Sequence, residues 1–162
     1  METKIYSIFP ACGKTWLCEH QEDYNLKILD SDSSNFSWVK CRDTFGKTTK
    51  IRNPDFPSNY IEHIKENIGK YDYIFVSSHA SVREALDKEG IDYTVVYPEQ
   101  SCKAEWVGRC FIREKRGEVG CGAEAMYNNF DEWFMDCFKT GITHKEIVLQ
   151  PTTYLSEYFE RW

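Results

Sequence analysis

The sequence contains no apolar run long enough to cross a membrane. A membrane-spanning helix needs about 20 consecutive, mostly apolar residues, and the apolar runs of this 162-residue chain are all much shorter. The first ten residues also lack the basic start and the long apolar core of a secretion signal. These absences predict a cytoplasmic protein with no membrane partner.

The chain also lacks paired cysteine spacing. Its seven cysteines are dispersed, and no two of them form a C-x-x-C pair. An odd, scattered set indicates reduced thiols rather than a disulfide framework or a zinc ribbon. Cys102, Cys110 and Cys121 share one segment, but a metal site there is disfavoured because paired ligand spacing is missing.

Positive charge is in deficit. Lysine and arginine number 20 against 26 acidic residues, so the formal net charge is −6. This balance argues against a broad affinity for nucleic acid, which we do not expect as a partner. With 41% hydrophobic and 28% charged residues, the composition is that of a soluble globular protein, and residues 1–162 form most simply one domain.

The N-terminal stretch IYSIFPACGKT, Ile5–Thr15, has the pattern of a phosphate-binding loop. An apolar run over residues 4–9 predicts a buried strand, and a turn containing proline leads into GKT and then a helix, whose positive end favours an anion. The glycine lets the backbone approach a phosphate, the lysine reaches the β and γ oxygens, and the threonine hydroxyl can ligate Mg²⁺. The expected nucleotide-binding residues are Ala11, Cys12, Gly13, Lys14, Thr15 and Trp16.

This motif is incomplete. The pattern G-x-x-x-x-G-K-[ST] places its first glycine where this chain has Ile8, and Ala11 stands where nucleotide kinases often carry another glycine. The alternative is an ordinary corner between a strand and a helix. The preceding strand and the position at the start of the chain favour the phosphate loop.

Acidic residues follow the next expected strand. The sequence LKIL predicts a short strand, and DSDSS follows it at residues 30–34. Open α/β sheets bind ligands at the carboxyl ends of their strands, so Asp30 is a candidate Mg²⁺ ligand together with Thr15, and Asp30, Asp32 and Ser34 are candidate substrate-binding residues. The alternative is a cluster of turn and helix-capping residues.

Residues 41–59 are expected to form an irregular basic loop. They carry four cationic side chains among polar residues, together with two prolines. Such a segment can hold the phosphate of an acceptor, with Arg52 as the candidate contact, or it is simply a solvated loop. A helix capped by Ser58 is expected to follow.

The rest of the chain alternates strands and helices. Strands are expected over 71–76, 92–97 and 145–149, and helices over 81–90, 124–139 and 152–162. This order favours a parallel sheet with helical crossovers, and so an α/β fold. Ser78 and His79 follow the first of these strands, where they can contact a ligand, although a surface position is the commoner one for a histidine.

A basic helical segment begins near residue 101. Arg109, Arg113 and Arg116 share one face of this helix, because they are four and three residues apart. Three glycines follow between residues 117 and 122 and make this tract flexible. Arginines beside a flexible tract suit a lid, over about residues 101–123, that closes on phosphates. The alternative is a solvated basic face.

Together these parts resemble the P-loop nucleoside monophosphate kinases, and most of all the small phage-type (deoxy)nucleotide kinases. The segments that carry the resemblance are FPACGKT, LDSDSSNF, NPDFPSNYIEHI and YIFVSSH. The resemblance covers nearly the whole chain, and the GKT loop is its specific motif. It implies a three-layer P-loop NTPase-type fold, with a five-stranded parallel sheet in the order 2-3-1-4-5 and helices on both faces. It also implies ATP as donor, Mg²⁺, and a nucleoside or deoxynucleoside monophosphate as acceptor.

The resemblance assigns roles to individual residues. The phosphate loop is matched by Gly13, Lys14 and Thr15, and the lid arginines that bridge donor and acceptor phosphates are matched by Arg109, Arg113 and Arg116. The acceptor would bind in an insert over about residues 31–69. A kinase of this kind would be a cytoplasmic monomer or homodimer, in the host cytoplasm if it is encoded by a phage.

The chain departs from this family at three positions. Ile8 and Ala11 replace glycines, and Ser77 stands where the family usually has an acid. These departures imply either a rearranged metal site or a reduced turnover.

Two other functions fit the same residues. One is a P-loop kinase of a hydroxyl acceptor, a polynucleotide 5′ end or a small metabolite, with Asp32 as the base that removes the hydroxyl proton. The other is a protein that binds nucleotides without turning them over. We rank the monophosphate kinase first. Its acceptor is already an anion, so Lys14 and the arginines would act through position and charge.

Overall fold

A computed structural model describes residues 2–161. Five strands form one parallel sheet in the order β2-β5-β1-β6-β7. From one edge to the other the strands are β2 (Ile28–Asp30), β5 (Tyr73–Ser77), β1 (Lys4–Ile8), β6 (Thr94–Pro98) and β7 (Lys145–Leu149). The expected α/β class and the five-stranded parallel sheet are confirmed.

Two strands lie outside this sheet. β3 (Trp38–Arg42) and β4 (Thr48–Arg52) pair only with each other, as an antiparallel hairpin. The labels β3 and β4 belong to the hairpin. If the five sheet strands alone are numbered by their position in the chain, their order across the sheet is 2-3-1-4-5.

The prediction of an irregular loop over residues 41–59 is therefore wrong. The turn of the hairpin explains why strands form there. The Asp43 carboxylate accepts the backbone amides of Phe45 and Lys47 at 2.9 and 2.8 Å, and Gly46 adopts φ 78°. An Asp followed by a left-handed glycine reverses the chain tightly, so the flanking residues pair.

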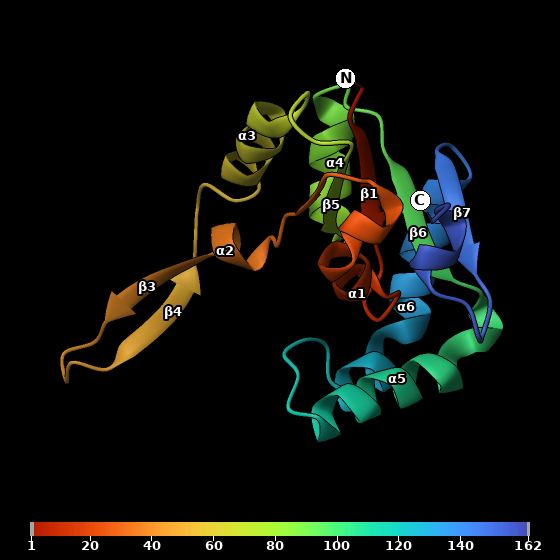
Figure 1. Cartoon of the computed structure of the whole chain (residues 1–162). Helices are drawn as coiled ribbons and strands as arrows, with labels where there is room; N and C mark the ends of the chain where they lie inside the picture. The colour runs from red at the N-terminus through yellow and green to blue at the C-terminus, as the bar shows by residue number, and fades with distance from the viewer. Residues whose placement is uncertain (1, 162) are drawn as a thin grey trace.

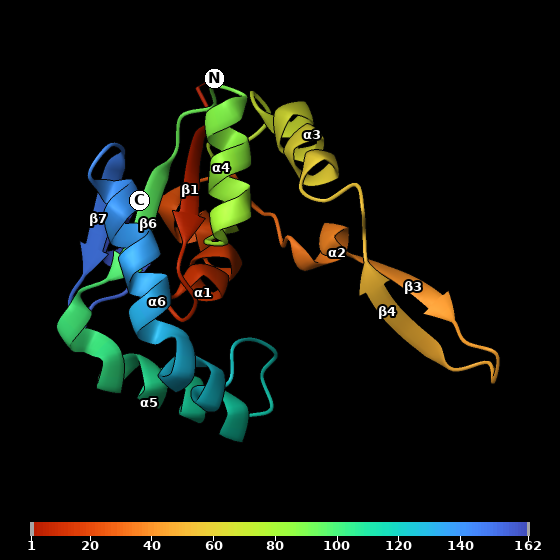
Figure 2. The ribbon, with the colours of Figure 1, turned by 180° about the vertical axis from the view of Figure 1, so that it is seen from behind.

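Helices cover both faces of the sheet. In Figure 2, α4 (Ala80–Lys88) and α6 (Ala123–Gly141) lie in front of the strands, whereas α1 (Lys14–Glu19) lies in front in the opposite view of Figure 1. Helix α3 (Ser58–Asn67) packs beside α4, and α5 (Lys103–Lys115) packs against α6 near the carboxyl ends of the strands. The helix expected after residue 57 is confirmed, with Pro57 rather than Ser58 in the capping position.

Short helical turns lie between the main elements and at the C-terminal end. Those between the main elements are the 3₁₀ turns η1 (Gln21–Tyr24) and η2 (Gln100–Cys102) and the single helical turn α2 (Ser34–Ser37). The closing helix expected over 152–162 is wrong: the structure has only the 3₁₀ turn η3 (Leu155–Tyr158), and Trp162 lies outside the described residues. The Leu155 amide donates to the Cys12 carbonyl at 2.9 Å, which draws this segment onto the loop after β1 instead.

The core has two clusters, one for each face of the sheet around β5. Ile74 and Val76 pack with residues of α3 and α4, and Phe75 packs on the side of α1. Successive strand residues point to opposite faces, and a strand buried on both faces is apolar throughout. Among residues 2–161, none of the helices combines the length and the apolar character that a membrane span requires.

Candidate functional site

The loop between β1 and α1 lies where the sheet changes direction. β2 and β5 lie on one side of β1, and β6 and β7 lie on the other. At such a switch point the connections leave in opposite directions, which opens a crevice outside the carboxyl ends of the strands. Residues 9–13 connect β1 to α1 at this point (Figure 1).

Every carbonyl group of residues 10–12 is held by a donor from another part of the chain. The three donors are, in order, the indole of Trp106 at 3.0 Å, the guanidinium of Arg109 at 3.0 Å and the backbone amide of Leu155 at 2.9 Å. Two of these donors belong to α5 and the third to η3. The loop is thus fastened from outside the sheet, on the side of α5 and the C-terminal segment.

The amides of the same peptide groups are left without protein partners. In a planar trans peptide, the N–H points away from the C=O that precedes it. The amides of Ala11, Cys12 and Gly13 therefore point away from the bound carbonyls, and within residues 2–161 none of them donates a hydrogen bond. Ala11 and Gly13 have positive φ angles, 62° and 90°, and left-handed residues of this kind occur in the backbone nests that bind anions. The loop therefore has free backbone donors that an anion could use.

Gly13 is required by its surroundings as well as by its φ angle. A β-carbon at this position would lie 2.9 Å from Cδ1 of Tyr154. The ring of Tyr154 also lies 3.9 Å from the Arg109 guanidinium, whose other neighbour is the Trp106 ring at 3.7 Å. Arg109 is stacked between two aromatic rings beneath the loop.

The three arginines expected in a lid have different positions. Arg109 donates to the carbonyls of Ala11, Pro151 and Thr153, so it fastens the loop to the C-terminal segment. Arg113 folds back onto the tract after α5, where it donates to the Val119 carbonyl at 3.1 Å. Arg116 follows the end of α5 and is exposed. Of the three, only Arg109 makes a hydrogen bond to the loop after β1 within residues 2–161, and it binds a carbonyl rather than the free amides.

Lys14 and Asp30 meet across the carboxyl end of β5. Nζ of Lys14 lies 2.8 Å from Oδ1 of Asp30, and both side chains are partly exposed. Among the described residues, no group of three or more His, Cys, Asp or Glu side chains is placed to hold a metal ion. Thr15 and Asp30 nevertheless suit Mg²⁺, because this ion keeps several waters and takes one or two protein oxygens together with substrate phosphates.

Asp32 and Ser34 form a turn. Oδ1 of Asp32 accepts the backbone amide of Ser34 at 2.9 Å, and both side chains are exposed. This is the turn arrangement that the sequence offered as the alternative to a binding role. The other carboxylate oxygen of Asp32 makes no hydrogen bond within residues 2–161, so it remains accessible to a ligand.

Two buried hydroxyls at this edge of the sheet have no partner. Within residues 2–161, Oγ of Ser31 and Oγ of Ser77 are enclosed without a hydrogen bond. The Tyr60 hydroxyl is close by, since it donates to the Ser31 carbonyl at 2.5 Å. A buried polar atom without a partner commonly marks a place where water or a ligand atom completes its hydrogen bonds.

His79 is placed among charged groups that come from three other elements. Partial burial of the ring lowers its pKa, and the positive charges of Arg52 and Arg83 lower it further, whereas Asp32 opposes them. Ser78 contributes its backbone carbonyl, which accepts a hydrogen bond from Arg83. The hairpin, the segment after β2 and helix α4 thus each bring a charged side chain close enough to affect His79.

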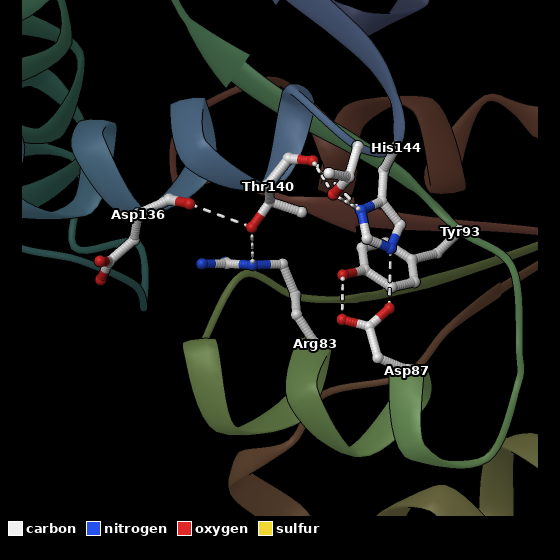
Figure 3. A network of polar contacts seen from close by, with 7 residues as sticks. Arg83, Asp87, Tyr93, Asp136, Thr140 and His144 are labelled. Atoms are coloured by element: carbon white, nitrogen blue, oxygen red, sulfur yellow. Dashed lines mark hydrogen bonds and ion pairs between the residues drawn. The ribbon is translucent and has the colours of Figure 1, made fainter.

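Arg83 is the residue of this group that the sequence did not reveal. It is only 3% exposed, and its Nε donates to Oγ1 of Thr140 at 3.2 Å (Figure 3). Within residues 2–161 it forms no ion pair with a carboxylate, and the Asp87 side chain, one helical turn along, is paired with His144 at 2.7 Å. A cation on the apolar side of a helix, directly after Val82, is the sequence signal that identifies it.

Other candidate sites are less well supported. Two hollows of about 250 and 210 Å³ lie at the N-terminal end of the sheet and between α3 and α4, away from the loop. All seven cysteines are free thiols, as expected. Neither a scan against protein-family models nor a search of curated proteins finds a match for this chain. Its function is therefore inferred from the geometry described above.

Proposed function

We propose that this protein is a P-loop kinase that transfers the γ-phosphoryl group of ATP to a nucleoside or deoxynucleoside monophosphate and so forms the diphosphate. The main support is the loop after β1. The carbonyls of residues 10–12 accept hydrogen bonds from α5 and η3, and the amides of residues 11–13 donate none within residues 2–161. Lys14 follows directly. Backbone amides and a lysine at a switch point are the groups that bind phosphates in this class of fold.

On the donor side, the chain supplies charge and position. The amides of Ala11, Cys12 and Gly13 would hold phosphate oxygens, and Lys14 would exchange the Asp30 carboxylate for the β and γ oxygens. An exposed ion pair contributes only about 0.2–1 kcal/mol, so this exchange costs little. Thr15 and the released Asp30 would hold Mg²⁺, which neutralises developing negative charge.

On the acceptor side, exposed Arg52 is the cation that can contact a ligand, and buried Arg83 adds positive charge behind it. Both lower the pKa of His79, and Arg83 has no carboxylate partner in residues 2–161. A monophosphate bound there needs no general base, because its phosphate is already an anion. The free hydroxyls of Ser31 and Ser77 lie at the same sheet edge and are candidates to orient the acceptor or its water.

This proposal includes the P-loop NTPase-type fold, with an acceptor-binding insert between β2 and β5 and a lid formed by α5 and the tract that follows it. The strand arrangement and the loop support it. In the lid, Arg113 and Arg116 remain candidates for phosphate contacts after closure, whereas the bonds of Arg109 favour a positioning role.

One observation favours a second acceptor class. Asp32 lies near His79 and keeps one carboxylate oxygen free of hydrogen bonds. A carboxylate at the acceptor is useful when a hydroxyl group must lose its proton. If the acceptor is a hydroxyl, Asp32→Asn should abolish transfer, whereas for a monophosphate acceptor it should mainly raise the KM.

The test of the donor site is Lys14→Ala, with Lys88→Ala as the control. Lys88 is an exposed lysine at the end of α4, remote from the loop. We expect Lys14→Ala to fold normally and to lose phosphoryl transfer by at least about 100-fold, the usual cost of removing a group that stabilises transition-state charge. Transfer at the wild-type rate by folded Lys14→Ala would contradict the assignment.

A further inference from the structure

The hairpin Trp38–Arg52, which we call the arm, concentrates positive charge. It projects away from the sheet and its helices in both views (Figures 1 and 2). It contains five cationic residues and one carboxylate, a net charge of +4 in a chain whose total is −6. The carboxylate of Asp43 accepts hydrogen bonds from two backbone amides of the turn. The negative total charge of the protein therefore hides a strongly basic segment.

The pairing of β3 with β4 places most of this charge on one side of the arm. Trp38 is opposite Arg52, Lys40 is opposite Lys50, and Arg42 is opposite Thr48. Because side chains alternate along a strand, these six residues share one face, which we call the basic face. The other face carries Val39, Cys41, Thr49 and Ile51.

The basic face is not neutralised by the rest of the described chain. Directly opposed side chains on antiparallel strands have β-carbons about 4.5–5.5 Å apart, and like charges at such positions are destabilising. Lys40 and Lys50 are such a pair, and neither has a carboxylate within 4.0 Å among residues 2–161. A lone two-stranded hairpin is at best marginally stable. An anion on this face would relieve the repulsion.

The extent of the basic face indicates an anion with several charges. Residues on one face of a strand repeat about every 7 Å, so the cations run from Arg52 at the base of the arm to Arg42 near its tip. A single mononucleotide in the crevice reaches only the base, where Arg52 lies near His79. The cations beyond it match a chain of phosphates.

The aromatic residue on this face narrows the choice of anion. Trp38 is 42% exposed, and the Arg52 guanidinium lies 5.1 Å from its ring. Proteins that bind single-stranded nucleic acid combine cations that follow the backbone with aromatic rings on which bases stack. An acidic peptide would leave the ring without such a partner.

We propose that the basic face of the arm binds single-stranded nucleic acid, with phosphates along Lys40, Lys50 and Arg42 and a base stacked on Trp38. This binding is separate from phosphoryl transfer and does not depend on the acceptor being a mononucleotide. It revises the expectation drawn from net charge, because the distribution of charge rather than its sum determines local affinity.

The test is the variant Lys40→Glu. A glutamate opposite Lys50 forms an attractive cross-strand pair, so the arm stays folded while both positions are lost to the ligand. The probe is a fluorescently labelled single-stranded DNA of about 15 nucleotides, a length that covers the site sizes of such proteins. Its anisotropy is measured over a series of salt concentrations. The control is Lys88→Glu, which makes the same change of charge on α4.

If the basic face binds single-stranded nucleic acid, we expect three results for the wild type and Lys40→Glu. The wild type should bind the DNA, with log Kd depending linearly on the logarithm of salt concentration. Lys40→Glu should weaken binding at least about tenfold at low salt. The slope of log Kd against log salt should be smaller by about 1.4 in this variant, because two cations each contribute about 0.7. Lys88→Glu should change affinity by less than about twofold, since α4 is outside the basic face.

Three results would overturn the inference. The first is no binding by the wild type at low salt. The second is an equal loss of affinity in Lys40→Glu and Lys88→Glu, which would reflect net charge alone. The third is an undiminished affinity for DNA in Lys40→Glu together with a raised KM for a mononucleotide, which would make the arm a cover for the acceptor instead.

Discussion

Replacing Arg109 by lysine should destabilise the protein even when no nucleotide is present. The guanidinium donates to the carbonyls of Ala11, Pro151 and Thr153 at 3.0, 3.1 and 2.7 Å. It is also stacked between two aromatic rings. Lysine keeps the positive charge, but its compact ammonium group can reproduce neither the planar stacking nor the fork of donors.

The size of the effect follows from the bonds that are lost. A hydrogen bond from a charged donor contributes about 1.5–3 kcal/mol, and lysine would keep one of the three. Because the site is partly exposed and water replaces some of the loss, we expect a total of about 3 kcal/mol. For a chain of 162 residues, each kcal/mol lowers Tm by about 2–4 °C, so the expected decrease is about 6–12 °C.

The assay is thermal unfolding of the ligand-free protein, followed by circular dichroism. Arg113→Lys is the matched control, because Arg113 lies on the same helix and contacts only the tract after it, through Val119 and Glu118; its Tm should change by less than about 3 °C. The reasoning is refuted if Arg109→Lys unfolds with the wild type and loses only phosphoryl transfer. Arg109 would then act on phosphates, as the sequence suggested, and the loop would be held by other groups.

Two further predictions concern the acceptor side. Tyr60→Phe removes a donor from a fully buried carbonyl at Ser31 and should cost about 1–3 kcal/mol, seen as a lower urea midpoint at unchanged m; an unchanged midpoint would mean that water replaces the hydroxyl. The pKa of His79 is lowered in the folded state, so protonation of this ring favours unfolding. The stabilising contribution of neutral His79 is therefore complete above the unfolded pKa of about 6.5 and is lost as the pH falls below it. His79→Gln should flatten this dependence, and in an NMR titration a monophosphate bound beside Arg52 should raise the pKa of His79; no shift on binding would place the acceptor elsewhere.

The centre of the sheet was predictable because its strands β1, β5 and β6 are largely buried on both faces. YIFV in β5 is apolar throughout, and the GKT sequence follows the apolar strand β1 after the short segment 9–12. The arm was not predictable in the same way. Both of its faces are exposed, so no burial pattern distinguishes it from a polar loop, and only the Asp and Gly of its turn indicate a reversal.

The orientation of α5 and the course of the C-terminal segment depend on contacts distant in sequence. Helical spacing places Trp106 and Arg109 on one face, but their partners are residues 10–11 and 151–154. Similarly, Leu155 and Phe159 have helical spacing, yet the Leu155 amide is bonded to the Cys12 carbonyl. A pattern within one segment cannot show that a distant carbonyl competes for its donors.

The central claim is that the loop after β1 serves phosphoryl transfer to a monophosphate. It is tested most directly by measuring ADP formation from ATP and Mg²⁺ over a panel of ribonucleoside and deoxyribonucleoside monophosphates, with a 5′-hydroxyl oligonucleotide and shikimate as hydroxyl acceptors. The account predicts turnover with one or a few monophosphates, formation of the matching diphosphate, and loss of both in Lys14→Ala. Turnover only with a hydroxyl acceptor, or nucleotide binding without turnover of any acceptor, would contradict it.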